Sequence, residues 1–194
     1  KAASAPFNSE RADVIIRTSD SVDFRVRKGV LAAASPFFDD MFTLPSIPVD
    51  RKRKNRDDGD EYIGDIPVIP MAEDSGTVDA LLRFCYPCRD PKIAYSIYLC
   101  RVLEASRKYI MEEVEERVYE QVQTMMRRKP FELYAIAAVR GWRKEMAEAA
   151  KFSLFFTSID DAYVPALEPL NYGHVQRLKR YHRACSHAAA GSIK

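Results

Sequence analysis

The sequence has little of what nucleotide-binding and catalytic motifs require. It contains seven glycines in 194 residues, and none of them forms a G-x-G-x-x-G motif or a phosphate-binding loop. Its three histidines all lie near the end of the chain, and no G-x-S-x-G motif marks a nucleophilic serine. We therefore predict that the protein is not an enzyme, has no cofactor and takes no small-molecule substrate.

Long apolar runs and a dominant charge are also absent. No run approaches the roughly 20 apolar residues that span a bilayer, and the first residues lack the apolar core of a signal peptide. We expect no membrane segment and an intracellular protein, cytoplasmic or nuclear, whose four cysteines are free thiols. The 30 basic and 28 acidic residues leave a net charge of +2, which disfavours nucleic acid as a partner.

The hydrophobic residues, 47% of the chain, are numerous enough for a core, and their pattern changes along the sequence. Residues 12–30 alternate like a β-hairpin around the turn residues 18–23. Residues 30–42 predict two short helices, because Ser35 can cap a helix and Pro36 suits a first helical position. Prolines bound the apolar run 65–71, which predicts an edge strand or a strand end.

From Glu73 onward the chain is helical in pattern, with apolar residues spaced three and four apart. The first two stripes are Val78, Leu81, Leu82 and Cys85, and then Leu99, Val102, Leu103, Ser106 and Ile110. Pro130 and Gly141 are expected to begin and end a further helix, and Asn171 to cap the last one. A hairpin, two helices, a lone strand and many helices predict an α+β fold with a small sheet flanked by helices.

The segment Cys85-Tyr86-Pro87-Cys88 has the spacing of a redox dithiol or of half a zinc site. A reactive thiolate is favoured at a helix N-terminus, whereas Cys85 falls in the last turn of the helix expected over residues 75–86. We therefore interpret Cys85 as a small core residue and predict no bound metal. His182 and Cys185 could share a helical face, but they supply only half a site.

Several separated blocks of the sequence resemble the BTB/POZ domain. They are Asp13-Val14 at a strand, Phe24, Val26 and Lys28 before a helix, Ser35 to Phe38 at a corner, Met41-Phe42, residues 78–91 and residues 99–118. The resemblance implies a BTB/POZ domain over residues 12–126 with a long charged loop at 45–66. It also implies an N-terminal arm at 1–11 and a helical, BACK-like extension at 127–194. Residues 67–71, 85–91 and 134–137, and Tyr181-His182 with Cys185, further resemble the fungal group of BTB proteins.

The resemblance implies a protein–protein interaction module with protein partners, in the form of a homodimer, an adaptor that recruits another protein, or both. Its dimer interface would involve the first two helices and the preceding strand. The candidates are Asp13, Lys28, Val30, Leu31, Ala34, Phe37, Phe38 and Met41. Asp13 and Lys28 would form a charged pocket at that interface, or simply a strand–helix ion pair. The short, polar arm favours a helix-packed dimer over a strand-swapped one.

Two other roles stay open. BTB adaptors of cullin ubiquitin ligases often carry a hydrophobic-x-Glu element, and residues 44–54 contain no clear copy of it. A transcription or chromatin regulator would use the basic run Arg51–Arg56, which could equally be a nuclear localisation signal or a solvated loop. The acidic residues that follow at 57–61 partly neutralise this run, and it lacks aromatic residues for stacking on bases.

Overall fold

The computed structural model describes residues 1–43, 61–156 and 163–191. These residues pack into two compact units. The first unit contains Lys1–Lys92 and Arg101–Val118, and the second contains Ile93–Cys100 and Tyr119–Lys194. The predicted division into residues 12–126 and 127–194 remains a prediction.

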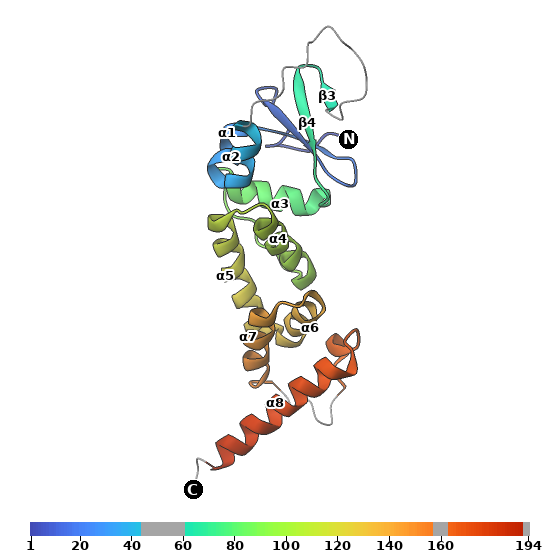
Figure 1. Cartoon of the computed structure of the whole chain (residues 1–194), viewed down its shortest axis with the longest axis vertical. Helices are drawn as coiled ribbons and strands as arrows, with labels where there is room; N and C mark the ends of the chain where they lie inside the picture. Colours follow the sequence, from blue (N-terminus) through green and yellow to red (C-terminus); the bar gives the residue numbers. More distant parts are fainter. Residues whose placement is uncertain (44–60, 157–162, 192–194) are drawn as a thin grey trace. The chain divides into compact units, whose positions relative to one another are not determined.

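The first unit is built on a four-stranded sheet with the order β2-β1-β4-β3. β1 (Val14–Arg17) and β2 (Asp23–Val26) are antiparallel, which confirms the predicted hairpin. β4 (Ile66–Pro70) runs parallel to β1, and β3 (Glu61–Ile63) is antiparallel to β4 (Figure 1). Val14, Ile15 and Ile16 are fully buried, so β1 forms the centre of this core.

Of the two expectations for the run 65–71, an edge strand was wrong, because β4 has a strand on each side, whereas Pro70 does lie at the strand end. Its two prolines are accommodated by a staggered register. Pro67 pairs only with β3 and Pro70 only with β1, whereas Val68 pairs with both neighbours. Each proline therefore has a sheet neighbour on one side only. At such a position the N–H that proline lacks disrupts the hydrogen bonds of the sheet least.

The expected loop 45–66 is also shorter than predicted. Residues 61–63 form β3 and turn through Gly64, which has a φ of 66°, directly into β4. The remainder of the expected loop, including the basic run Arg51–Arg56, lies outside the described residues.

The N-terminal residues 1–11, expected to be a short polar arm, also contain a buried apolar residue. They lie along the outer edge of β2, with bridges from Ala2 to Asp23 and from Asn8 to Arg25. Phe7 is completely buried and its ring contacts Phe24 at 5.8 Å between centroids. The apolar Phe7 therefore docks this segment onto its own chain and covers an open sheet edge.

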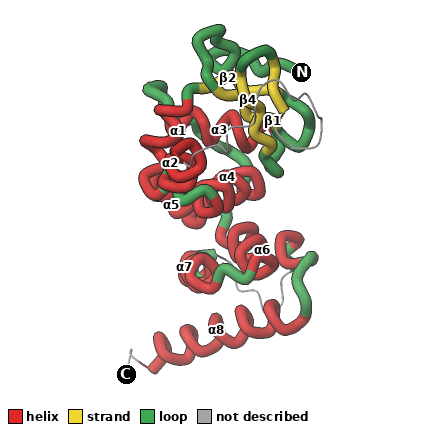
Figure 2. The backbone as a smooth tube through the Cα atoms, turned by 45° about the horizontal axis from the view of Figure 1, so that its top comes forward, coloured by secondary structure: helices red, strands yellow, loops and turns green. Residues whose placement is uncertain are grey.

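Two short helices follow the hairpin, α1 (Lys28–Ala34) and α2 (Pro36–Thr43), and they lie beside the sheet (Figure 2). Ser35 separates them as predicted, since its Oγ accepts the Phe38 N–H at 3.2 Å at the start of α2. The same hydroxyl donates to the carbonyl oxygen of Tyr109. α3 (Ser75–Cys85) begins at Asp74, whose carboxylate accepts the Thr77 N–H at 2.8 Å.

α4 (Ser96–Lys108) and α5 (Glu112–Arg128) each contribute to both units. The α4 stripe is buried as predicted through Ser106, but Ile110 does not continue it. Ile110 lies between the helices with a φ of 51° and a 48% exposed side chain. A β-branched residue rarely adopts a positive φ. The turn there is fixed by the Met111 N–H, which donates to the Ser106 carbonyl at 2.9 Å.

The rest of the second unit contains α6 (Pro130–Arg140), α7 (Arg143–Ser153), the 3-10 turn η1 (Pro165–Leu167) and α8 (Tyr172–Gly191). Pro130 begins α6 and Gly141 ends it with a φ of 70°, as predicted. Asn171 caps α8, because its Oδ1 accepts the His174 N–H at 3.0 Å. None of the helices in the described ranges is long and apolar enough to cross a bilayer.

Candidate interaction surface on α1 and α2

Helices α1 and α2 divide the predicted interface residues into two groups. Leu31 and Phe38 are each 1% exposed, so they belong to the core of their own chain and do not form part of a free surface. Four others are partly exposed on the same two helices: Val30, Ala34, Phe37 and Met41. We call these four residues the α1–α2 face. Helical spacing alone could not separate the two groups, because both repeat three and four residues apart.

The α1–α2 face is supported from below by aromatic rings. Phe38 stacks on Phe42 at 6.0 Å and on Tyr109 at 5.4 Å between ring centroids. The ring of Phe37, which is 37% exposed, contacts the ring of the same tyrosine at 5.5 Å between centroids. Such aromatic pairs contribute about 0.5–1.5 kcal/mol each beyond their buried area. They fix α2 against the end of α4, so the exposed side chains are held on a rigid base.

Tyr109 is itself anchored by a partly buried hydrogen-bond network. Its hydroxyl donates to Glu73 at 2.6 Å, and Lys108 donates to the other oxygen of that carboxylate at 2.8 Å. Burial and the hydrogen bond to the carboxylate raise the pKa of Tyr109 to about 12. Burial alone would raise the pKa of Glu73, but the bonds from Lys108 and Tyr109 outweigh it and hold that pKa low. The carboxylate therefore stays charged and keeps the ring in place at neutral pH.

Within the described residues, Asp13 and Lys28 do not form the strand–helix ion pair that was one of the two predictions, whereas the charged pocket at a dimer interface stays a prediction. The Asp13 carboxylate accepts the backbone N–H of Lys28 at 2.6 Å, and no ion pair joins their side chains in the described chain. The Lys28 ammonium instead lies 5.5 Å from the centre of the Phe42 ring. Asp13 thus caps the first turn of α1, where N–H groups lack intrahelical partners and a negative charge is favoured.

Tyr86 completes this cap. Its hydroxyl accepts the backbone N–H of Arg27 at 2.9 Å, while the Arg27 side chain makes no capping bond. Its ring meets the buried Phe7 edge-on at 5.3 Å. Sequence patterns could not predict this role of Tyr86, because its partner Arg27 lies 59 residues away.

A model of the BTB/POZ domain family matches residues 5–125 of this chain. The chain belongs to the BTB/POZ domain family. No curated protein matches the chain significantly. Among solved structures, the BTB domain of zebrafish PATZ1 is similar over 58% of this chain and 76% of its own, with 19% identity and a TM-score of 0.42.

BTB/POZ domains are protein–protein interaction and dimerisation modules, and this chain combines the α+β fold of the family with a helical extension.

The two thiols of the Cys85–Cys88 segment differ in burial, and Cys85 is less buried than the expected core position. Cys85 is half-buried at the end of α3 and donates to the Leu81 carbonyl at 3.3 Å. Burial raises the pKa of the Cys85 thiol to about 12, whereas a reactive thiol requires a lowered pKa. Cys88 is exposed and donates to the Arg83 carbonyl at 3.2 Å. Within residues 1–43, 61–156 and 163–191, no group of three His, Cys, Asp or Glu side chains could hold a metal.

One serine–histidine pair was not foreseen. Ser153 and His182 lie 2.7 Å apart between Oγ and Nε2, and both are buried. The serine hydroxyl donates its proton to the Ala150 carbonyl at 2.7 Å, so its oxygen must accept from the histidine. This direction is the reverse of what a general base requires, and the pair therefore ties α7 to α8.

Proposed function

We propose that the chain forms a homodimer through the α1–α2 face. The observation that carries this proposal is the exposure of Val30, Phe37 and Met41 on a base of stacked aromatic rings. A two-fold axis through this face would bring the same apolar patch of both copies together, which makes the surface complementary to itself. A stable interface of this kind buries about 800 Å² per partner.

The docked N-terminal segment supports a helix-packed dimer. Residues 1–8 already occupy the outer edge of β2 on their own chain, through the Asp23 N–H donating to the Lys1 carbonyl and the Arg25 N–H donating to the Phe7 carbonyl. A strand-swapped dimer would have to break these bonds and expose Phe7. Packing of helices needs no such exchange.

The double variant Val30→Glu/Met41→Glu tests the dimer. It places two carboxylates on each copy of the face, opposite their equivalents, where like charges in an apolar interface are strongly unfavourable. We expect the wild type to sediment as a dimer at micromolar concentration and the variant as a folded monomer with unchanged circular dichroism.

Val139→Glu is the matched control, because Val139 is a helical valine that is 67% exposed on α6. It should leave the dimer intact. A monomeric wild type, or a dimer that survives both substitutions on the α1–α2 face, would refute the proposed interface.

We also propose an adaptor role, in which the domain of residues 12–126 dimerises and the extension of residues 127–194 recruits another protein. A cullin ligase scaffold and a transcriptional complex are the two specific partners to test, by co-purification with a cullin and by DNA binding with its salt dependence. The segments that would decide either role, residues 44–54 and Arg51–Arg56, lie outside the described residues. Placement in the fungal group and in the cytoplasm or nucleus likewise remains a prediction.

A further inference from the structure

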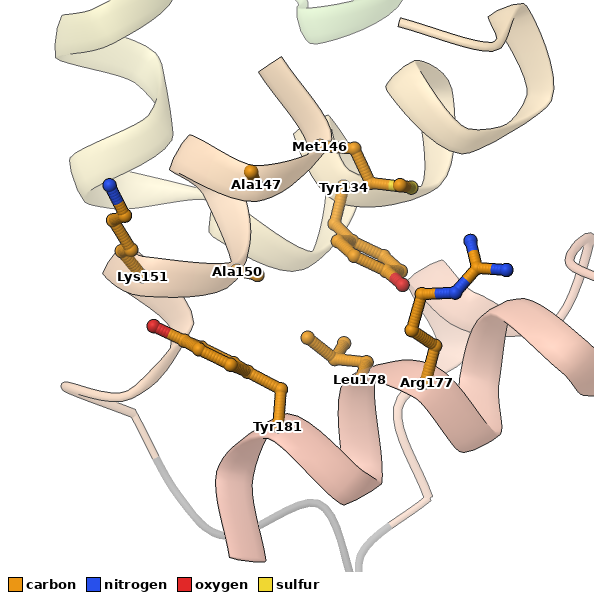
Figure 3. Close-up of a pocket in the computed structure, with 8 residues that line it drawn as sticks. All are labelled: Tyr134, Met146, Ala147, Ala150, Lys151, Arg177, Leu178 and Tyr181. Atoms are coloured by element: carbon orange, nitrogen blue, oxygen red, sulfur yellow. The ribbon is translucent and has the colours of Figure 1, made fainter. Parts of the chain in front are cut away.

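The second unit contains an apolar pocket between helices α6, α7 and α8. Its volume is about 210 Å³. Met146, Ala147 and Ala150 from α7 line one side, and Leu178 and Tyr181 project from α8 on the other (Figure 3). The Tyr134 ring from α6 closes one end, and its hydroxyl already donates to the His174 carbonyl at 2.9 Å. The walls therefore offer an occupant apolar contact.

The size of the pocket restricts what it can hold. An engineered apolar cavity of about 150 Å³ accommodates benzene, whereas sites for drug-sized ligands and cofactors occupy about 300–1,000 Å³. A pocket of about 210 Å³ matches one leucine, methionine or phenylalanine side chain. It is too small to bury most of a cofactor. This comparison favours a single anchoring side chain from another protein.

Two cations lie at opposite ends of the pocket, Lys151 on α7 and Arg177 on α8 (Figure 3). Both residues are exposed, and within the described residues neither has an ion-pair partner. α8 adds to this charge because it carries four Lys and Arg residues and no Asp or Glu. A partner that places carboxylates on both sides of its apolar anchor would satisfy these cations. A partner with basic flanks would be repelled.

We propose that this α6–α8 pocket binds a short acidic segment of a partner protein, with one bulky apolar side chain inserted between carboxylates that contact Lys151 and Arg177. The inference rests on the proposed adaptor role and does not depend on the dimer. The partner class follows from the combination of features. Cations alone would also attract nucleic acid, but a phosphate backbone has no apolar group to insert into the apolar pocket between them.

The test uses the full chain and a fluorescein-labelled peptide, Gly-Ser-Glu-Glu-Phe-Glu-Glu-Ser-Gly, titrated by fluorescence anisotropy. Two control peptides replace the phenylalanine with serine or all four glutamates with lysine. Burying a phenylalanine side chain contributes about 1.5–3 kcal/mol, so the serine peptide should bind about 10- to 100-fold more weakly. The lysine peptide should show no measurable binding.

Three variants locate the site. Arg177→Glu reverses one cation at the pocket, and Ala147→Phe fills the exposed wall without changing charge. We expect each to weaken binding of the phenylalanine peptide by at least about tenfold. Arg180→Glu is the matched control, because it makes the same charge change on an exposed α8 residue that does not line the pocket. Its effect should stay within about threefold.

Three outcomes would overturn the proposal: no binding at about 1 mM peptide, equal losses from Arg177→Glu and Arg180→Glu, or indifference to Ala147→Phe. A 12-base-pair DNA duplex provides a further comparison. If it binds more tightly than the peptide and its binding is unaffected by Ala147→Phe, the basic residues serve nucleic-acid binding instead, and the proposal is wrong. Repeating the titration with Val30→Glu/Met41→Glu separates the two proposals, since a monomeric chain should bind the peptide unchanged.

Discussion

Replacing Asp13 with alanine should destabilise the protein by removing the cap on α1. The Asp13 carboxylate lies 2.6 Å from the backbone nitrogen of Lys28 and has no ion pair with the lysine side chain within the described chain. Loss of a helix cap costs about 0.5–2 kcal/mol. Asp13→Asn should restore most of this stability, because an asparagine oxygen caps a helix about as well as a carboxylate.

The companion substitution Lys28→Met removes the ammonium but keeps the backbone N–H that Asp13 binds. An exposed cation over a ring contributes about 0.5–1 kcal/mol, so we expect the smaller loss here. Urea denaturation of the wild type and the three variants at equal protein concentration measures both effects through the midpoint. A constant slope would confirm that the denatured state is unchanged.

An ion pair would give a different pattern. Asp13→Asn would then cost as much as Asp13→Ala, Lys28→Met would match both, and all three losses would shrink in about 1 M salt, where exposed pairs are screened. That pattern would refute the capping interpretation. It would also restore the strand–helix ion pair, which was the alternative to the charged pocket implied by the family resemblance.

The remaining predictions concern a thiol and a carboxylate. Because the pKa of Cys85 is raised to about 12, Cys88 should react with a thiol reagent at pH 8 much faster than Cys85 in the native protein, and equal rates would contradict the buried position. Hydrogen bonds from the Ser75 and Thr18 hydroxyls lower the pKa of Asp20 to about 2 from 3.8. Its stabilising effect is therefore present above about pH 4 and lost as the pH falls toward 2. Asp20→Asn should be less stable than the wild type at pH 7, with a gap that narrows on acidification; a constant gap would contradict this.

The local elements of this fold follow from short-range patterns. The alternation around residues 18–23 produced the hairpin, and Ser35-Pro36 separated α1 from α2, because turn and capping residues act within a few positions of themselves. Pro130, Gly141 and Asn171 mark helix ends for the same reason. Spaced apolar residues likewise identified the buried stripe of α4 through Ser106.

Errors arose where a distant segment decided the outcome. β4 became an internal strand because β1, some 50 residues earlier in the chain, and β3 flank it, and its prolines alone indicated an edge. Phe7 looked like part of a polar arm, yet Phe24 and Tyr86 give it a buried site. Ile110 left the α4 stripe because the chain turns there to start α5.

The sequence by itself determined the class of the molecule. A BTB/POZ domain with a helical extension could be predicted from its separated motifs, its hairpin and its apolar helical stripes. This was possible because a family fold is encoded in the spacing of many weak signals. Only the tertiary structure decided which apolar residues are available to a partner. Leu31 and Val30 are neighbours with similar side chains, but one is buried against its own chain and the other remains partly exposed. That distinction, like the pocket between α6, α7 and α8, depends on which surfaces other helices cover, and no local pattern records it.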